Sequence, residues 1–261
     1  MQTRTGKGHL EMNTMRNLKT LLAALLLSPA LVFASDVGLE LDRAPDISGN
    51  NAALQNGARL FVNYCQGCHG LSAIRYNQML AFGLTEQQIA DNLMFAADKI
   101  GDQMTTAMKP ADAKRWFGAA PPDLSLVARA RASEAGSGAD WLYTYLRTFY
   151  RDDSRSTGWN NLVFDKVGMP HILVDLQGEQ VLEEEKDAAG HVTHKLKLVK
   201  TGRFAPEEYD NQIRDLVGFL TWAGEPQAEL RKQLGVAVLL FLAVMFVFAY
   251  LLKKEYWKDV H

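Results

Sequence analysis

Five consecutive residues constrain this chain more than any other stretch: Cys65, Gln66, Gly67, Cys68 and His69. Two thiols three positions apart can form thioether bonds to the vinyl groups of a haem, and an adjacent imidazole can bind its iron as the proximal ligand. The motif therefore predicts one covalently attached haem c, bound through Cys65 and Cys68 and ligated by His69.

Other uses of this motif fit less well. A thioredoxin-type redox pair is expected in a strand–helix–strand context without an adjacent histidine. A zinc site needs further ligands, and the whole chain has 2 cysteines. A short structural disulfide would leave His69 without a role. The covalent haem is the interpretation that uses all three residues.

The N-terminal region has the pattern of a secretory leader. Arg16 and Lys19 precede an apolar run at 21–27, and residues 32–34 suit a cleavage site. The apolar run is too short to span a membrane. We therefore expect residues 1–34 to be an N-terminal extension and cleavable signal peptide. Both Met1 and Met15 remain open as the start of translation.

The charge balance excludes one class of partner. Of the 28 basic residues, 4 lie before position 35, whereas 1 of the 30 acidic residues does. The mature chain is therefore moderately acidic, which argues against nucleic acid and favours a basic partner. One hypothesis is that Glu183–Glu185, with Asp152 and Asp153, form a docking surface for a basic electron carrier. A solvated hairpin without a partner explains the same residues.

The C-terminal region predicts a membrane anchor. Residues 234–252 carry no charge and are long enough to cross the hydrocarbon core as one helix. A buried core helix of this length would usually keep a polar face. Basic residues flank both ends, so the export of residues 35–230 sets the orientation. We expect a periplasmic domain at 35–230, a single-pass anchor in the inner membrane at 231–252, and a cytoplasmic tail at 253–261.

Helical periodicity dominates the rest of the chain. It predicts helices that share apolar faces, over 52–64, from Thr85 to about 97, over 141–149 and over 207–223. Alternation within 177–203 predicts a solvated β-hairpin. The expected fold is mostly α: a c-type cytochrome haem domain with long loops and a small β-hairpin, plus one C-terminal transmembrane helix.

A distal iron ligand is the open question of the haem site. Thioether sulfur favours reduced iron, so a methionine ligand suits a carrier late in an electron chain. Met108 and Met169 lie next to or near a proline in irregular segments, and the residues alone do not separate them. His171 lies too near Met169 to be excluded. Methionines on predicted helices are more often core residues.

Four separated motifs resemble one known family: CQGCH at 65–69, APPDLSLVARAR at 120–131, GMP at 168–170, and FLTWAGEP followed by RKQLG at 219–235. The family is cytochrome c1, the membrane-anchored haem subunit of the cytochrome bc1 complex, in a bacterial form. The resemblance implies that Met169 is the distal ligand and that Arg131 pairs with a haem propionate. Segment 177–203 departs from the mitochondrial pattern, so no function is transferred to it.

The resemblance also implies partners and a reaction. The chain would take an electron from the Rieske iron–sulfur protein, beside cytochrome b, and pass it to a soluble or tethered c-type cytochrome. It would be a non-catalytic redox subunit of an oxidoreductase complex. A charged propionate shielded from water needs a cation, which supports the role of Arg131, although a surface arginine explains the residue too. The alternative functions are a membrane-anchored haem enzyme or sensor with an open distal site, and a tethered donor outside any complex.

Overall fold

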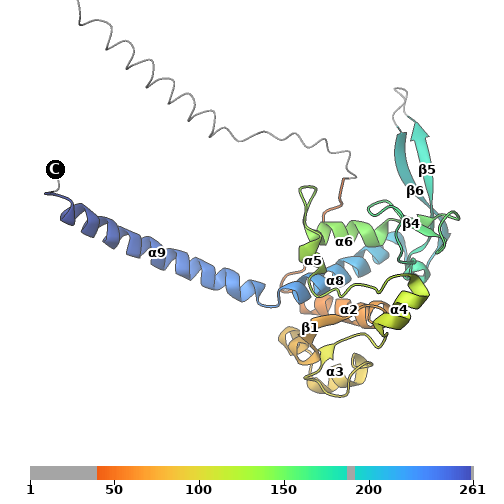
Figure 1. Cartoon of the computed structure of the whole chain (residues 1–261), viewed down its shortest axis with the longest axis horizontal. Helices are drawn as coiled ribbons and strands as arrows, with labels where there is room; N and C mark the ends of the chain where they lie inside the picture. The colour runs from red at the N-terminus through yellow and green to blue at the C-terminus, as the bar shows by residue number, and fades with distance from the viewer. Residues whose placement is uncertain (1–39, 187–191, 260–261) are drawn as a thin grey trace, which may run out of the picture. The chain divides into compact units, whose positions relative to one another are not determined.

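The computed structural model of this protein describes residues 40–186 and 192–259 (Figure 1). The predicted leader, with both candidate start residues, lies outside the described residues. Its cleavage therefore remains an expectation.

The described region is mainly helical. Its helical elements are, in chain order, α2 (Asn51–Leu60), the π-helical turn η1 (Phe61–Cys65), the 3₁₀ helix η2 (Tyr76–Phe82), α3 (Glu86–Asn92), α4 (Pro110–Phe117), α5 (Val127–Ala130), α6 (Gly138–Arg147), α7 (Val174–Gln177), α8 (Pro206–Gly224) and α9 (Ala228–Tyr256). Its strands form three antiparallel pairs: β1 (Leu71–Arg75) with β2 (Gln103–Met104), β3 (Phe149–Arg151) with β4 (Trp159–Asn161), and β5 (Gly178–Lys186) with β6 (Val192–Thr201). The predicted fold class is confirmed, and the first two strand pairs are additions to it.

The helix that leads to the cysteines begins and ends in characteristic ways. The side chain of Asn50 accepts a hydrogen bond from a backbone N–H of the first turn of α2, as an N-cap does. At its other end the helix widens into η1, where the backbone N–H of Gln66 bonds to the carbonyl of Phe61 at 2.9 Å. Wide turns of this kind are frequent at functional sites. The helix predicted over 52–64 is confirmed, and its widened last turn ends at Cys65.

Helix α2 crosses α8 at very close range, and this crossing supports the cysteine-bearing turn. A Cβ added at Gly57 would overlap the carbonyl oxygen of Asp215, so only glycine permits the approach. Beside it, the rings of Phe61 and Phe219 lie 5.9 Å apart. The side-chain amide of Asn56 donates to the carboxylate of Asp215 at 2.8 Å. The hydrophobic core therefore packs directly against η1.

The sequence predicted two further helices with less accurate ends. The capping box at Thr85 is present, but α3 ends at Asn92 rather than near 97. In this last turn the side chain of Asn92 donates to the carbonyl of Gln88. Helix α6 starts earlier than expected, at a second capping box formed by Ser137 and Asp140. It ends before Phe149, which lies in strand β3.

The predicted hairpin is the β5–β6 pair, which projects from the helical part in Figure 1. Two of its acidic residues pair with lysines of the opposite strand: Glu183 lies 2.8 Å from Lys197, and Glu185 lies 3.7 Å from Lys195. The surface of the hairpin is therefore mixed in charge. This pairing weakens the hypothesis that the glutamates form an acidic docking surface.

Helix α9 has the properties of a membrane span. It has 29 residues, and an 18-residue window reaches a mean hydropathy of 2.8 with none of it buried. At about 1.5 Å per residue it is about 43 Å long, more than the hydrocarbon core requires. It extends beyond the predicted anchor, 231–252, at both ends. No other helix of the described ranges meets these criteria of length and apolarity.

Candidate haem site

The two cysteines lie in a tight turn after η1. The backbone N–H groups of Cys68 and His69 both donate to the carbonyl of Cys65, at 3.0 and 2.8 Å. Both thiols are free. Burial, reinforced by the neighbouring Cys68, raises the pKa of the Cys65 thiol to about 12. A reactive redox cysteine needs a lowered thiol pKa, so this environment disfavours the thioredoxin-type alternative.

The imidazole of His69 is held in one tautomer. Its Nδ1 lies 2.6 Å from the carbonyl oxygen of Pro122, which can only accept a hydrogen bond. Nδ1 therefore carries the proton and Nε2 keeps its lone pair, as an iron-binding histidine requires. Burial lowers the pKa of His69, and the contacts with Pro122 and Asp123 offset this in part. The ring is thus neutral at physiological pH.

The Pro-Pro-Asp-Leu-Ser segment fastens the strand that follows His69. The backbone N–H of Leu124 donates to the carbonyl of Gly70 at 2.8 Å. The carboxylate of Asp123 accepts a hydrogen bond from the backbone N–H of Ser72 at 2.8 Å. The hydroxyl of Ser125 accepts one from the backbone N–H of Ala73 at 3.0 Å. Burial tends to raise the pKa of Asp123, but hydrogen bonds from Ser125 and Ser72 outweigh it and lower the pKa. The Pro-Pro-Asp-Leu-Ser segment therefore fixes the position of strand β1 directly after His69.

Two residues inside the cysteine motif are also anchored. The amide of Gln66 is buried and donates to the hydroxyl of Tyr76 at 2.6 Å and to the carbonyl of Thr105 at 3.2 Å. The hydroxyl of Thr106 donates to the carbonyl of Gly67 at 3.0 Å. These contacts cannot be read from the sequence, because no periodic pattern marks a buried glutamine between two cysteines.

Met169 lies in the irregular segment predicted for it. It is half-buried against the hydrophobic core, and its sulfur accepts a hydrogen bond from the hydroxyl of Tyr145 at 3.4 Å. Met108 is also half-buried, but it is not among the described side chains that pack on the core. Met104 is fully buried on β2. Of these two candidates, only Met169 packs on the described core and contacts Tyr145, and its role as distal ligand stays a prediction.

His171 belongs to an aromatic cluster. Its ring stacks on Phe149 with centroids 4.9 Å apart, and it meets the edge of Trp159 at 5.0 Å. Burial lowers the pKa of His171 to about 4, so it is neutral. This packing favours a core role for His171.

Arg131 is exposed, and aromatic rings hold its guanidinium. The group lies 4.4 Å from the ring centroid of Trp141 and 5.5 Å from that of Phe164. Within 40–186 and 192–259, no carboxylate forms a recorded ion pair with it. Trp141 in turn stacks on Tyr145 at 4.8 Å, and Tyr145 contacts Met169. The predicted residues therefore fall into two groups, His69 with the cysteines and Arg131 with Met169, and segment 122–131 joins them.

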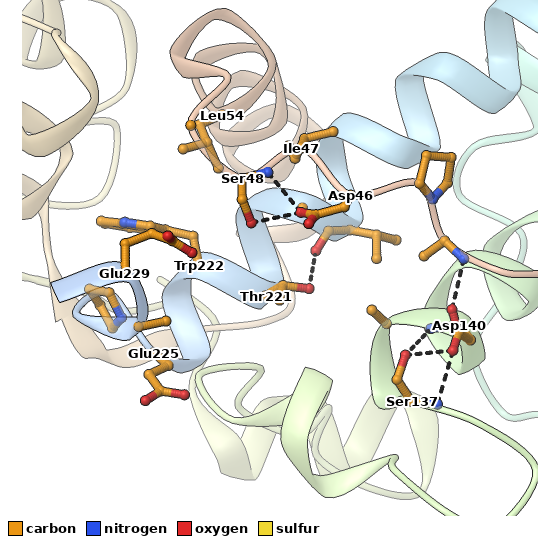
Figure 2. Close-up of a pocket in the computed structure, with 18 of the residues that line it drawn as sticks. Asp46, Ile47, Ser48, Leu54, Ser137, Asp140, Thr221, Trp222, Glu225 and Glu229 are labelled. Atoms are coloured by element: carbon orange, nitrogen blue, oxygen red, sulfur yellow. Dashed lines mark hydrogen bonds between the residues drawn. The ribbon is translucent and has the colours of Figure 1, made fainter. Parts of the chain in front are cut away.

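A separate groove of about 740 Å³ lies near the junction of α8 and α9 (Figure 2). Its charged lining residues are both basic and acidic: Arg43, Lys232, Asp46, Asp140, Glu225 and Glu229. It contains neither a cysteine nor a histidine nor a methionine. The groove is therefore not the haem site.

The donor set fits haem c. Two thiols adjoin an imidazole whose Nε2 keeps its lone pair, and a thioether keeps a lone pair beside its hydrogen bond. In the described part of the chain, no three His, Cys, Asp or Glu side chains are grouped to hold a metal ion, which disfavours the zinc alternative. With helix α9, the one described helix that is long and apolar enough to cross a membrane, these features define a c-type cytochrome domain joined to a membrane helix.

Comparison with known proteins identifies the family. The model of the Cytochrome C1 family matches residues 47–260. Cytochrome c1 of Allochromatium vinosum is 49% identical over 241 residues, which cover 91% of this chain and 96% of that protein. The ammonia monooxygenase gamma subunit of Nitrosomonas europaea is 48% identical over 247 residues, covering 95% and 100%. Cytochrome c1 of Rhodospirillum rubrum is 31% identical over 240 residues, covering 79% and 81%. The chain belongs to the cytochrome c1 family.

Membership of this family confirms several predictions. Cytochromes c1 carry a covalently attached haem c and act as electron-transfer subunits of the cytochrome bc1 complex, together with cytochrome b and the Rieske protein. Helix α9 fits the single-pass anchor of such a subunit.

Proposed function

We propose that this chain accepts one electron from the Rieske iron–sulfur protein and passes it to a soluble or tethered c-type cytochrome. In this proposal Cys65 and Cys68 attach the haem, and His69 and Met169 ligate its iron. Arg131 pairs with a propionate. The observation that carries the proposal is the hydrogen bond from His69 Nδ1 to the Pro122 carbonyl, which leaves Nε2 as the ligand atom.

The residues of the chain set the conditions for electron transfer. The haem, when bound, supplies the one-electron redox change. The hydrogen bond at Pro122 fixes the ring of His69. The thioether of Met169 favours the reduced state and so raises the reduction potential. Arg131, held over Trp141, would offer a cation to a haem propionate.

The proposed topology follows from the two ends of the chain. The haem domain, 35–230, lies in the periplasm, 231–252 anchors it in the inner membrane, and 253–261 remains in the cytoplasm. Helix α9 supports the anchor. N-terminal sequencing of the membrane-bound protein tests the leader. We expect the mature chain to begin near Ser35, and an intact segment 15–34 would contradict this topology.

A second candidate function comes from one relative's name. A protein 48% identical to this chain is named as a subunit of an ammonia monooxygenase. Affinity purification of this chain from its native membranes separates the two candidates. Recovery with cytochrome b and the Rieske protein supports the proposal, and recovery with a monooxygenase supports the alternative.

Spectroscopy of the membranes tests the redox role. A reduced-minus-oxidised spectrum, recorded with and without the gene for this chain, should lose a low-spin c-type signal in the deletion. Quinol-dependent reduction of an added c-type cytochrome should be lost with it. A haem that is five-coordinate when reduced and binds carbon monoxide would instead indicate an enzyme or sensor.

A further inference from the structure

The hydrogen bond between Tyr145 and Met169 joins residues that the sequence places far apart. The hydroxyl of Tyr145 lies 3.4 Å from the sulfur of Met169, across 24 residues of chain. A hydroxyl–sulfur contact is a weak hydrogen bond, and here it reaches the atom proposed to bind iron.

The ring of Tyr145 is held firmly in place. It is 8% exposed. Trp141, one turn earlier on α6, stacks on it at 4.8 Å with an interplanar angle of 14°. Phe149 meets it edge-on at 5.1 Å. Its own carbonyl accepts a hydrogen bond from the side chain of Asn161 at 2.8 Å. Packing on both sides leaves the hydroxyl directed at Met169.

Thioether sulfur has two lone pairs, so one can bind iron while the other accepts a hydrogen bond. We propose that Tyr145 is a positioning residue, which holds the sulfur of Met169 on the iron and raises the reduction potential of the haem. This inference rests on the proposed ligation by Met169.

The direction of the effect follows from simple electrostatics. The hydrogen bond draws electron density from the sulfur, and the sulfur then donates less electron density to iron. The ferric state needs that donation more than the ferrous state, so the hydrogen bond favours reduction.

The test is the substitution Tyr145→Phe in the full-length, membrane-bound protein. It removes one oxygen and keeps the stacking with Trp141 and Phe149. We expect about a threefold change in the ratio of oxidised to reduced haem at a fixed potential, which is a fall of about 30 mV at 59 mV per tenfold. Added imidazole should also displace Met169 faster than in the wild type.

Tyr143→Phe is the matched control. Tyr143 lies on the same helix and is 7% exposed, but its ring packs under the guanidinium of Arg147 at 4.4 Å. This variant should keep the wild-type potential. A fluorinated tyrosine placed at position 145 alone is a stronger donor and should raise the potential, which gives a second test that does not depend on Tyr145→Phe folding.

The outcomes are distinct. A lower potential in Tyr145→Phe, with the ferric iron–sulfur absorption band retained, supports the proposal. Equal potentials in the wild type, Tyr145→Phe and the fluorinated protein overturn it while leaving the ligation by Met169 intact. Absence of that band from the wild type shows that Met169 is not the ligand, and the proposed function then fails first.

Discussion

The turn that carries the cysteines and the β5–β6 hairpin are both held by polar contacts, but of different kinds. In the turn, bonds such as that of His69 to Pro122 use backbone groups close to the core. In the hairpin, Glu183 and Lys197 pair while their side chains are 43% and 61% exposed. Backbone bonds near a core specify one geometry, whereas exposed ion pairs add little stability. The backbone bonds of the cysteine turn therefore set the geometry of the site, whereas the ion pairs of the hairpin keep its surface polar.

The two regions also differ in their support. The cysteine turn rests on the crossing of α2 and α8, where Gly57 lies against the backbone of Asp215. The hairpin is fastened near its base, where the amide of Gln180 donates to the carbonyls of Arg147 and Phe149, both at 3.0 Å. Substitutions that disturb the packing of α2 on α8 should therefore alter the haem site, and substitutions in the hairpin should not.

Gly57→Ala should have the largest effect on this comparison. The added methyl overlaps a backbone carbonyl that has no freedom to move aside, so α2 and α8 must separate. We expect a loss of about 3 kcal/mol or more in the free energy of unfolding, measured by chemical denaturation of the haem protein. Gly101→Ala is the control, because nothing lies within 4 Å of a Cβ added there. Equal stabilities of the two variants would contradict the role of the crossing.

Asp123→Ala should have an intermediate effect. It leaves the backbone N–H groups of Ser72 and Ser125 without their acceptor, which should cost about 2 kcal/mol. Asp153, whose side chain is 95% exposed, supplies the control Asp153→Ala, which should unfold as the wild type does. A spectrum of Asp123→Ala identical to the wild type, at unchanged stability, would show that Asp123 does not fasten the strand that follows His69.

The stabilisation by Asp123 should depend on pH in a definite direction. The folded pKa of Asp123 is below its ordinary value, so its contribution is complete above the unfolded pKa of about 3.9 and is lost as pH falls through the folded pKa. The stability difference between the wild type and Asp123→Asn should therefore shrink in acid. A constant difference from neutral pH down to strongly acidic pH would show that the charge of Asp123 has no part in it.

The hairpin should show the smallest effect. The double variant Glu183→Gln, Lys197→Gln removes one exposed ion pair, and we expect no measurable change in the denaturation midpoint or the haem spectrum. The salt dependence of electron transfer should also stay the same, because the pair has no net charge. A changed salt dependence would restore the hypothesis that this hairpin docks a charged carrier.

Local sequence patterns predicted the helices and the hairpin well, but they could not predict contacts between residues far apart in the chain. The motif at 65–69, the helix over 207–223 and the hairpin follow from spacing alone. The bond between His69 and Pro122 joins residues 53 positions apart, so a pattern of neighbours carries no signal for it. Likewise, the acidic run at 183–185 suggested a charged surface, because the pairing with Lys195 and Lys197 exists only after the strands align.

The candidate distal site shows the same limit. The helix predicted over 141–149 puts Trp141 and Tyr145 one turn apart, and their rings stack in the structure. The hydroxyl of Tyr145, however, meets a sulfur on a different segment. The preference for Met169 over Met108 rests on the family resemblance, since both residues have the same local signature.

The most direct test of the account compares Met169→Leu with Met108→Leu. Leucine keeps the volume and apolarity, so the fold should change little, and the haem should stay attached through Cys65 and Cys68. We predict that reduced Met169→Leu binds carbon monoxide and has a lower potential, with each fall of about 59 mV equal to a tenfold change in equilibrium. Met108→Leu should do neither. Carbon monoxide binding by Met108→Leu and not by Met169→Leu would contradict the account.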